Sequence, residues 1–359
     1  MIALNVSDNR FQIFMKLIKF LSSSVLILIA LLVANTNLHA QTVRPMPLAS
    51  GTYKLADVRM RDVCILADAK TKTYYAISSG RSEAKAGFKN AAVRAFTSKD
   101  LVNWEGPHTI FQTPADLWDD ANIIGIWAPE MHFYKGKYYL FLTFDTDTKL
   151  GEQWRDWLPR VRRASQILVG DSPLGPFKQF TNQPSLPADM MTLDATLWEE
   201  DGIPYAVFAH EWVQIKDGTI EFVKLKSDLS AIDGEPKKLF DGSDAPWARK
   251  SPQYGCWVTD GPYLYKSKSG KLFMIWSSFS RTGYTTGVAV SDSGRLAGPW
   301  RQNAEPLYST DGGHGMLFKR FDGQLMLVLH SPNKMTERAK LFEIEDTGET
   351  LRIRKAFAN

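Results

Sequence analysis

Four carboxylates in this chain stand at or near the start of apolar segments, where a strand would be expected to begin. Asp62 opens "DVCIL", Asp194 opens "DATLW" and Asp260 opens "DGPYLY", while Glu130 lies inside "WAPEMHFY". A single acid at such a place is usually a turn cap. Four acids at one place would repel one another and lose solvation, which raises one pKa and leaves another low. General acid and base catalysis needs that division of pKa values.

The acids belong to a strand–turn–strand segment that recurs along the chain. In four of the five copies the turn contains glycine, in the pairs Lys-Gly, Asp-Gly, Ser-Gly and Asp-Gly, which suit tight hairpins. The fifth position in the series holds His314 rather than an acid. The five copies span residues 61–79, 127–144, 193–210, 256–279 and 312–330.

A second phrase follows four of these hairpins and consists of a short strand, a Ser/Asp turn and a proline exit. It occupies residues 96–107, 167–177, 224–236 and 287–300. Three or four strands therefore recur about every 65 residues without a convincing helix between them. Four-stranded units repeated around a ring form a β-propeller. The sequence predicts an all-β, single-domain, five-bladed β-propeller over residues 41–359, with a β-sandwich as the alternative.

A propeller would bring the acids together, because the first strand of every blade lines the central channel. Aligning the hairpins gives one position per blade at the mouth of this channel. Those positions are Asp62, Glu130 (or Pro129), Asp194, Asp260 and His314.

The first forty residues have the features of a secretory signal peptide. A Lys-flanked start precedes an apolar core at 25–33, and small residues lead to Ala40. Met15 makes a better start than Met1. An uncleaved membrane anchor is the less favoured alternative, because the core is shorter than the roughly 20 residues that a span needs. We expect an exported protein, periplasmic or extracellular, with no membrane span after cleavage.

Charge and cysteine content exclude several classes of site. The chain has 43 basic and 39 acidic residues, without the concentrated basic face that nucleic-acid binding requires. Cys64 and Cys256 fall in repeats that are not neighbours, which favours two buried free thiols over a disulfide. The six histidines are scattered, so we find no zinc-binding pattern.

At these motifs the sequence resembles glycoside hydrolase family 43, whose members are five-bladed propellers that release arabinose, xylose or related sugars. The resemblance covers residues 50–350 and rests on Asp62 in "RD", "WAPEMHFYKGKYYLF", "LDATLW", "DGPYLY" and "GGHGMLF". It implies an inverting glycosidase in which Asp62 is the general base. It also implies that Asp194 orients the sugar and tunes the pKa of the acid.

The general acid is the point at which the chain departs from the family pattern. Members of the family have Glu-Gly-Pro at the position where this chain has Asp260-Gly-Pro, and the side chain of aspartate is one methylene shorter than that of glutamate. Glu211 in "FAHEWVQ" is a second candidate, because the second strand of a hairpin returns to the mouth beside Asp194. The sequence leaves the choice between Asp260 and Glu211 open.

Other residues are expected to contact the sugar rather than to transfer protons. Trp127 and Trp212 adjoin the mouth acids and offer flat apolar faces to sugar C–H bonds. Glu130, His210 and His314 complete the predicted binding set. Relatives often have a histidine near a channel-bound calcium at the place of His314, so a structural calcium is left open; no cofactor is required.

These expectations describe an exported, inverting glycoside hydrolase that removes terminal furanosyl or pyranosyl residues from plant or other polysaccharides. The α-L-arabinofuranosidase, β-xylosidase and galactofuranosidase types all fit. The main alternative is a non-catalytic glycan-binding propeller. A third interpretation is a phosphorylase, which would need basic residues to bind phosphate at the mouth of the channel. The expected partner is an oligo- or polysaccharide; the sequence gives neither the sugar nor the oligomeric state.

Overall fold

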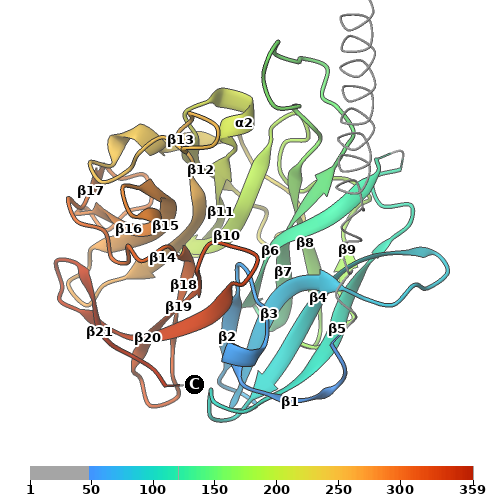
Figure 1. Ribbon diagram of the computed structural model, residues 1–359, viewed down its shortest axis with the longest axis horizontal. Coiled ribbons are helices and arrows are strands. Elements are labelled where there is room, and N and C mark those ends of the chain that lie inside the picture. The colour runs from blue at the N-terminus through green and yellow to red at the C-terminus, as the bar shows by residue number, and fades with distance from the viewer. Residues whose placement is uncertain (1–47, 120, 359) are drawn as a thin grey trace, which may run out of the picture. The chain divides into compact units, whose positions relative to one another are not determined.

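The computed structural model describes residues 48–119 and 121–358, which form five antiparallel sheets arranged as the blades of a propeller (Figure 1). Four sheets have four strands, and the first has five. The predicted fold class is confirmed. The signal peptide predicted for residues 1–40 lies outside the described residues. In the described part of the chain, no helix is long and apolar enough to cross a membrane.

The strands run in sequence order from the centre of each blade outward, apart from one added at an outer edge. Blade I consists of β2 (Cys64–Asp68), β3 (Thr73–Arg81), β4 (Phe88–Ser98), β5 (Trp104–Pro114) and, at its edge, β1 (Gly51–Tyr53). Blade II consists of β6 (Ile123–Tyr134), β7 (Lys137–Thr146), β8 (Ala164–Gly170) and β9 (Lys178–Gln179). Blade III consists of β10 (Thr192–Glu200), β11 (Ile203–His210), β12 (Thr219–Lys224) and β13 (Lys237–Asp241).

Blades IV and V repeat the same order. Blade IV consists of β14 (Asp260–Lys266), β15 (Leu272–Ser280), β16 (Gly283–Ser291) and β17 (Trp300–Gln302). Blade V consists of β18 (Gly313–Lys319), β19 (Leu325–Ser331), β20 (Arg338–Asp346) and β21 (Leu351–Ala356). The described helical elements are short: η1 (Leu55–Asp57), α2 (Trp212–Ile215) and η2 (Gly242–Asp244).

The five inner strands form a closed ring. Each of β2, β6, β10 and β14 contacts the inner strand of the next blade, and β18 contacts β2. Figure 1 shows these five labels gathered at the centre of the view, with β5, β9, β13, β17 and β21 at its periphery. The first strands therefore line one axis, as the repeat predicted.

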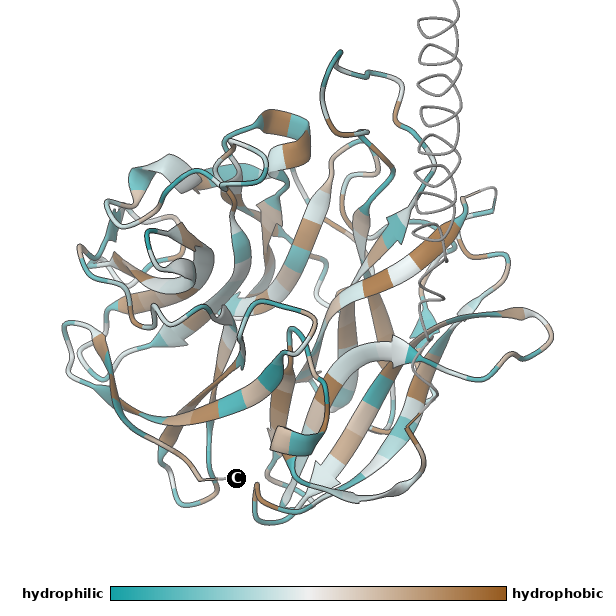
Figure 2. Cartoon of the chain, viewed as in Figure 1, coloured by the Kyte–Doolittle hydropathy of each residue, from teal (hydrophilic) through white to brown (hydrophobic). Residues whose placement is uncertain are grey.

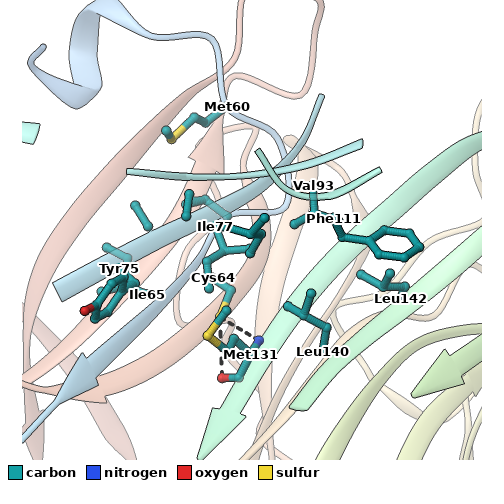
Figure 3. Packing of buried hydrophobic residues seen from close by; sticks show 14 of the residues in the cluster. Met60, Cys64, Ile65, Tyr75, Ile77, Val93, Phe111, Met131, Leu140 and Leu142 are labelled. Atoms are coloured by element: carbon teal, nitrogen blue, oxygen red, sulfur yellow. Dashed lines mark hydrogen bonds between the residues drawn. The ribbon is translucent and has the colours of Figure 1, made fainter. Parts of the chain in front are cut away.

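The core lies between neighbouring blades, because each sheet buries both of its faces. Hydrophobic residues recur along the strands, while the connecting loops are mainly hydrophilic (Figure 2). The largest cluster joins blades I, II and V and includes Trp104 and Trp118, both fully buried. Figure 3 shows part of this cluster, in which the backbone N–H of Met131 donates to the sulfur of Cys64 at 3.3 Å. Cys64 and Cys256 are both buried and free, as predicted.

Candidate active site

The same backbone conformation recurs in the first half of the inner strand of blades II to V, and just before the inner strand of blade I. One residue there has a positive φ between 41° and 55°. In blades II to V the strand pairing skips two residues at this point, so the left-handed residue sits in a β-bulge. A bulge of this kind redirects a side chain out of the regular pleat. The five left-handed residues are Asp62, Ala128, Asp194, Gly261 and His314.

The positions of these left-handed residues show that the alignment predicted from the sequence is wrong in two blades. The equivalents of Asp62 and Asp194 are Ala128 and Gly261, not Glu130 and Asp260. Asp260 stands one residue before the left-handed Gly261, and Glu130 stands two residues after the left-handed Ala128. The hairpin pattern could not reveal this, because a two-residue skip shifts the register without changing the alternation of apolar residues that follows.

The predicted acids nevertheless meet in one cavity of about 360 Å³. This volume lies within the usual range for small-molecule sites. The four predicted catalytic carboxylates line it, as do three of the predicted sugar-contacting residues, Trp127, Trp212 and His314; the four carboxylates are Asp62, Asp194, Asp260 and Glu211. The full lining is Arg61, Asp62, Ser79, Trp127, Leu193, Asp194, Glu211, Trp212, Tyr254, Val258, Asp260, Phe279, Tyr284, His314 and Asn333.

Asp62 is surrounded by basic groups. Its Oδ1 lies 3.1 Å from His330 Nδ1 and 3.4 Å from His314 Nδ1, and its Oδ2 lies 3.7 Å from Arg61 Nε. Burial on its own would raise the pKa of Asp62, but the two histidines and the arginine outweigh burial and hold this pKa well below its usual range. Asp62 is therefore ionised at neutral pH.

Asp194 lies in the opposite electrostatic setting. It is 7% exposed and accepts a hydrogen bond from the backbone N–H of Gly261 at 3.0 Å. Burial, reinforced by the nearby charge of Asp62, raises the pKa of Asp194 to about 8 against the effect of that hydrogen bond. Thr143 Oγ1 accepts the Asp194 backbone N–H at 3.0 Å, which anchors the turn itself.

Asp260 also favours the protonated form. Burial, followed by repulsion from Asp194, raises the pKa of Asp260 to about 7. The Tyr284 hydroxyl donates to Asp260 Oδ2 at 2.8 Å. Because Asp194 repels Asp260, the protonation of Asp260 is coupled to the charge on Asp194.

Glu211 is committed to an ion pair. Arg163 Nη1 lies 2.5 Å from Glu211 Oε1 and 2.7 Å from Oε2, and Glu211 is 2% exposed. Burial raises the pKa of Glu211, and Arg163 opposes that rise. Arg163 Nε also donates to Asp145 at 2.7 Å, so one guanidinium joins two carboxylates.

Aromatic residues form two walls of the cavity. The guanidinium of Arg163 lies over the ring of Trp127, 4.1 Å from its centroid, and Trp127 is 37% exposed. The rings of Trp212 and Tyr254 stack at 5.0 Å with an interplanar angle of 27°. Flat rings of this kind can pack against the C–H face of a sugar.

Two predicted contact residues lie elsewhere. Glu130 pairs with His132 and accepts a hydrogen bond from Thr196, and it is not among the residues that line the cavity. His210 also lies outside the lining, because its ring nitrogens face Glu221 at 3.1 Å and Gln214 at 2.9 Å. Both side chains are satisfied by protein groups.

Tyr284 and Arg163 were not among the predicted catalytic or sugar-binding residues. Arg163 immediately precedes β8 and Tyr284 is the second residue of β16, each the third strand of its blade. In an antiparallel sheet the third strand begins at the same end as the first, so its opening residues also reach the mouth. Inspecting the starts of the third strands would have found both residues.

The described residues give no support to a metal centre. Among residues 48–119 and 121–358, no group of three or more His, Cys, Asp and Glu side chains could hold a metal ion. The ring nitrogen Nδ1 of His314 lies near two carboxylates, 3.4 Å from Asp62 and 3.6 Å from Asp194. The structural calcium near His314, which the sequence leaves open, remains untested.

Comparison with known sequences gives a family match over most of the chain. The profile of the glycosyl hydrolases family 43 matches residues 56–355. An extracellular exo-α-(1→5)-L-arabinofuranosidase of Streptomyces avermitilis is 25% identical over 327 residues, which are 87% of this chain and 62% of the relative. A β-xylosidase of Bacillus subtilis is 25% identical over 215 residues, 58% of this chain and 35% of the relative. The chain thus spans less than two thirds of the length of these curated relatives.

Solved structures share the same architecture. The crystal structure of an endo-arabinase from Bacteroides thetaiotaomicron has 37% sequence identity and a TM-score of 0.70, covering 83% of this chain and 98% of that chain. The α-L-arabinofuranosidase of Lactobacillus brevis has 20% identity and a TM-score of 0.62, covering 80% and 90%. At that identity the second likeness shows the fold alone.

Proposed function

The chain belongs to glycosyl hydrolase family 43, and from this membership we propose that it hydrolyses α-L-arabinofuranosyl linkages with inversion at the anomeric carbon. The choice of sugar is supported by the endo-arabinase at 37% identity and by the curated exo-acting arabinofuranosidase. We take the released unit to be a terminal residue, as for the curated exo-acting arabinofuranosidase. Xylosides and galactofuranosides are the competing substrates.

The catalytic roles divide between two carboxyl groups. Asp62, ionised beside its basic neighbours, removes a proton from the water that attacks the anomeric carbon. Asp260, protonated, donates its proton to the glycosidic oxygen as the C–O bond breaks. Water and glycoside thus become a sugar of inverted configuration and a free hydroxyl group, and both carboxyls return to their starting states by exchange with solvent.

Asp194 acts on the proton donor and on the sugar. Its position raises the pKa of Asp260, which keeps the donor protonated near neutral pH. We assign proton donation to Asp260 rather than Glu211, because both oxygens of Glu211 accept hydrogen bonds from Arg163. In this proposal Glu211 holds Arg163 against Trp127.

One observation carries the proposal: a carboxyl group with a lowered pKa, Asp62, lines the same cavity as three with raised pKa values, Asp194, Asp260 and Glu211. The test is hydrolysis of a panel of 4-nitrophenyl furanosides and pyranosides, followed by the same assay on Asp62→Asn. We expect the arabinofuranoside to be the best substrate and Asp62→Asn to lose at least a hundredfold in kcat, the lower end of what acid–base groups contribute.

The control for this assay is Asp147→Asn, the same substitution at an exposed carboxylate. Asp147→Asn should keep wild-type activity. Substantial turnover by Asp62→Asn would remove the assignment of the base. Binding of arabino-oligosaccharides without hydrolysis of any substrate in the panel would favour the glycan-binding propeller instead.

We also propose that the protein is exported after removal of residues 1–40. Support comes from the signal-like sequence and from the curated relative that is described as extracellular. Fractionation of cells that express the full chain, with sequencing of the mature N-terminus, tests this. A mature chain that begins near Gln41 outside the cytoplasm is the expected result, and an intact Met1 or Met15 terminus inside the cell would contradict it.

A further inference from the structure

The side chain of the proposed proton donor, Asp260, is not oriented by the left-handed backbone conformation that Asp62 and Asp194 adopt. Asp62 and Asp194 are both left-handed residues, and Asp194 lies in a β-bulge, whereas Asp260 stands one position before the left-handed residue of its blade, where blades II and III have Trp127 and Leu193. Its side chain is also one methylene shorter than the glutamate of the family pattern. The orientation of its carboxyl must therefore come from neighbouring side chains.

Tyr284 supplies a contact that can set this orientation. Its hydroxyl donates to Asp260 Oδ2 at 2.8 Å, and it is 2% exposed at the edge of the cavity. Because Oδ2 accepts this hydrogen bond, Oδ1 is the oxygen that is left to carry the transferable proton.

Tyr284 is itself held firmly. Its ring stacks on His330 at 5.6 Å with an interplanar angle of 16°, and Phe279 packs against its edge at 5.6 Å and 61°. A Cβ atom on Gly313 would lie 2.6 Å from Tyr284 Cε1, so the absence of a side chain there leaves the space that the ring fills. The ring has little freedom to turn.

The same stack reaches the proposed base. His330 is fully buried, and its Nδ1 lies 3.1 Å from Asp62 Oδ1. A continuous series of contacts therefore runs from Asp260 through Tyr284 and His330 to Asp62. These side chains come from three blades: IV for Asp260 and Tyr284, V for His330 and I for Asp62.

We propose that Tyr284 is a positioning residue that, stacked on His330, orients the proton-bearing oxygen of Asp260 relative to Asp62. This inference rests on the proposed function, since it assumes that Asp260 is the proton donor. The relative orientation of donor and base would then depend on two residues besides the three acids, the stacked Tyr284 of blade IV and His330 of blade V.

The test is Tyr284→Phe, which keeps the ring and its stack and removes only the hydroxyl. On an arabinobiose, whose leaving group needs a proton, we expect kcat to fall about tenfold to hundredfold with KM nearly unchanged. This is the size expected for a lost hydrogen bond to a carboxyl group that becomes charged as it gives up its proton. On 4-nitrophenyl arabinofuranoside, whose leaving group needs none, the loss should be a few-fold at most.

A second readout is the pH dependence of kcat/KM. The Tyr284 hydrogen bond favours the ionised form of Asp260 and so lowers its pKa. Removing the hydroxyl should therefore move the basic limb of the profile to higher pH. The matched control is Tyr308→Phe, which removes a hydroxyl bonded to Ser331 at 3.2 Å and should leave both the profile and the substrate ratio unchanged.

Asp260→Asn, assayed in parallel, separates the two claims. If Asp260→Asn keeps wild-type turnover of the arabinobiose, the donor assignment in the proposed function fails. If Asp260→Asn is inactive on the arabinobiose but Tyr284→Phe loses equally on both substrates, or loses nothing, the positioning role of Tyr284 is overturned and the donor assignment stands. A selective loss on the arabinobiose together with the shifted limb supports both.

Discussion

At the scale of single residues, the environment of each carboxyl divides the proposed roles. The pKa of Asp62 is lowered by three basic neighbours, whereas burial and nearby carboxylates raise the pKa values of Asp194 and Asp260. The residue types alone would not separate the three, since all are aspartates. The two histidines that face Asp62 and the carboxylates that most strongly repel Asp194 and Asp260 come from other blades, so the sequence around each aspartate could not predict its pKa.

This division predicts the pH profile of the wild-type protein. The donor pair must hold a proton, so kcat/KM should fall as the pH rises through about 7 to 8, the pKa values of Asp260 and Asp194. The base must be ionised, so activity should persist on the acid side well below the usual aspartate pKa of about 4.

Asp194→Asn should move the basic limb to lower pH, because it removes the charge that raises the pKa of Asp260. A basic limb that stays in place in this variant would contradict the role of Asp194.

At the scale of elements, the hairpins were predictable and the bulges were not. Alternating apolar residues around glycine turns indicated the inner two strands of each blade, and the Ser/Asp phrases indicated the outer strands. The short edge strand β1 was missed, because three residues of a strand carry too little pattern. The bulges were missed because the left-handed residue is aspartate, alanine, glycine or histidine in different blades. No common residue type marks them.

Gly261 shows why one blade uses glycine at this bulge. A Cβ atom there would lie 2.9 Å from Cγ and Cδ2 of His314, which contacts both Asp62 and Asp194. Gly261→Ala should therefore displace His314 and lower kcat at least tenfold. It should also lower the free energy of unfolding by about 1–2 kcal/mol, the cost of alanine in a left-handed conformation. Steady-state kinetics and thermal melting measure the two effects.

Gly270→Ala is the matched control for this substitution. Gly270 also has a positive φ, 86°, but a Cβ atom there would meet nothing within 4 Å. It should lower the melting temperature without lowering kcat. Equal effects of the two substitutions on kcat would show that backbone strain, rather than displacement of His314, explains the loss.

At the scale of the whole molecule, the site depends on closure of the ring. Blades I, III and IV each supply one of the three acids, and blade V supplies both histidines that face Asp62. Blade I meets blade V without sharing a strand: β18 contacts β2, and Arg59 pairs with Glu337 at 2.7 Å. No blade alone contains a donor and a base, so the proposed chemistry is a property of the assembled propeller.

The central claim is that Asp62 activates water across the cavity from a protonated carboxyl, which requires inversion. Proton NMR of the first sugar released from an α-L-arabinofuranoside measures this directly, because the two anomers give separate signals before they interconvert. We predict that the β-anomer appears first and that the α-anomer grows in only by mutarotation. An α-anomer at the earliest time points would mean retention, and it would contradict the assignment of Asp62 as a base.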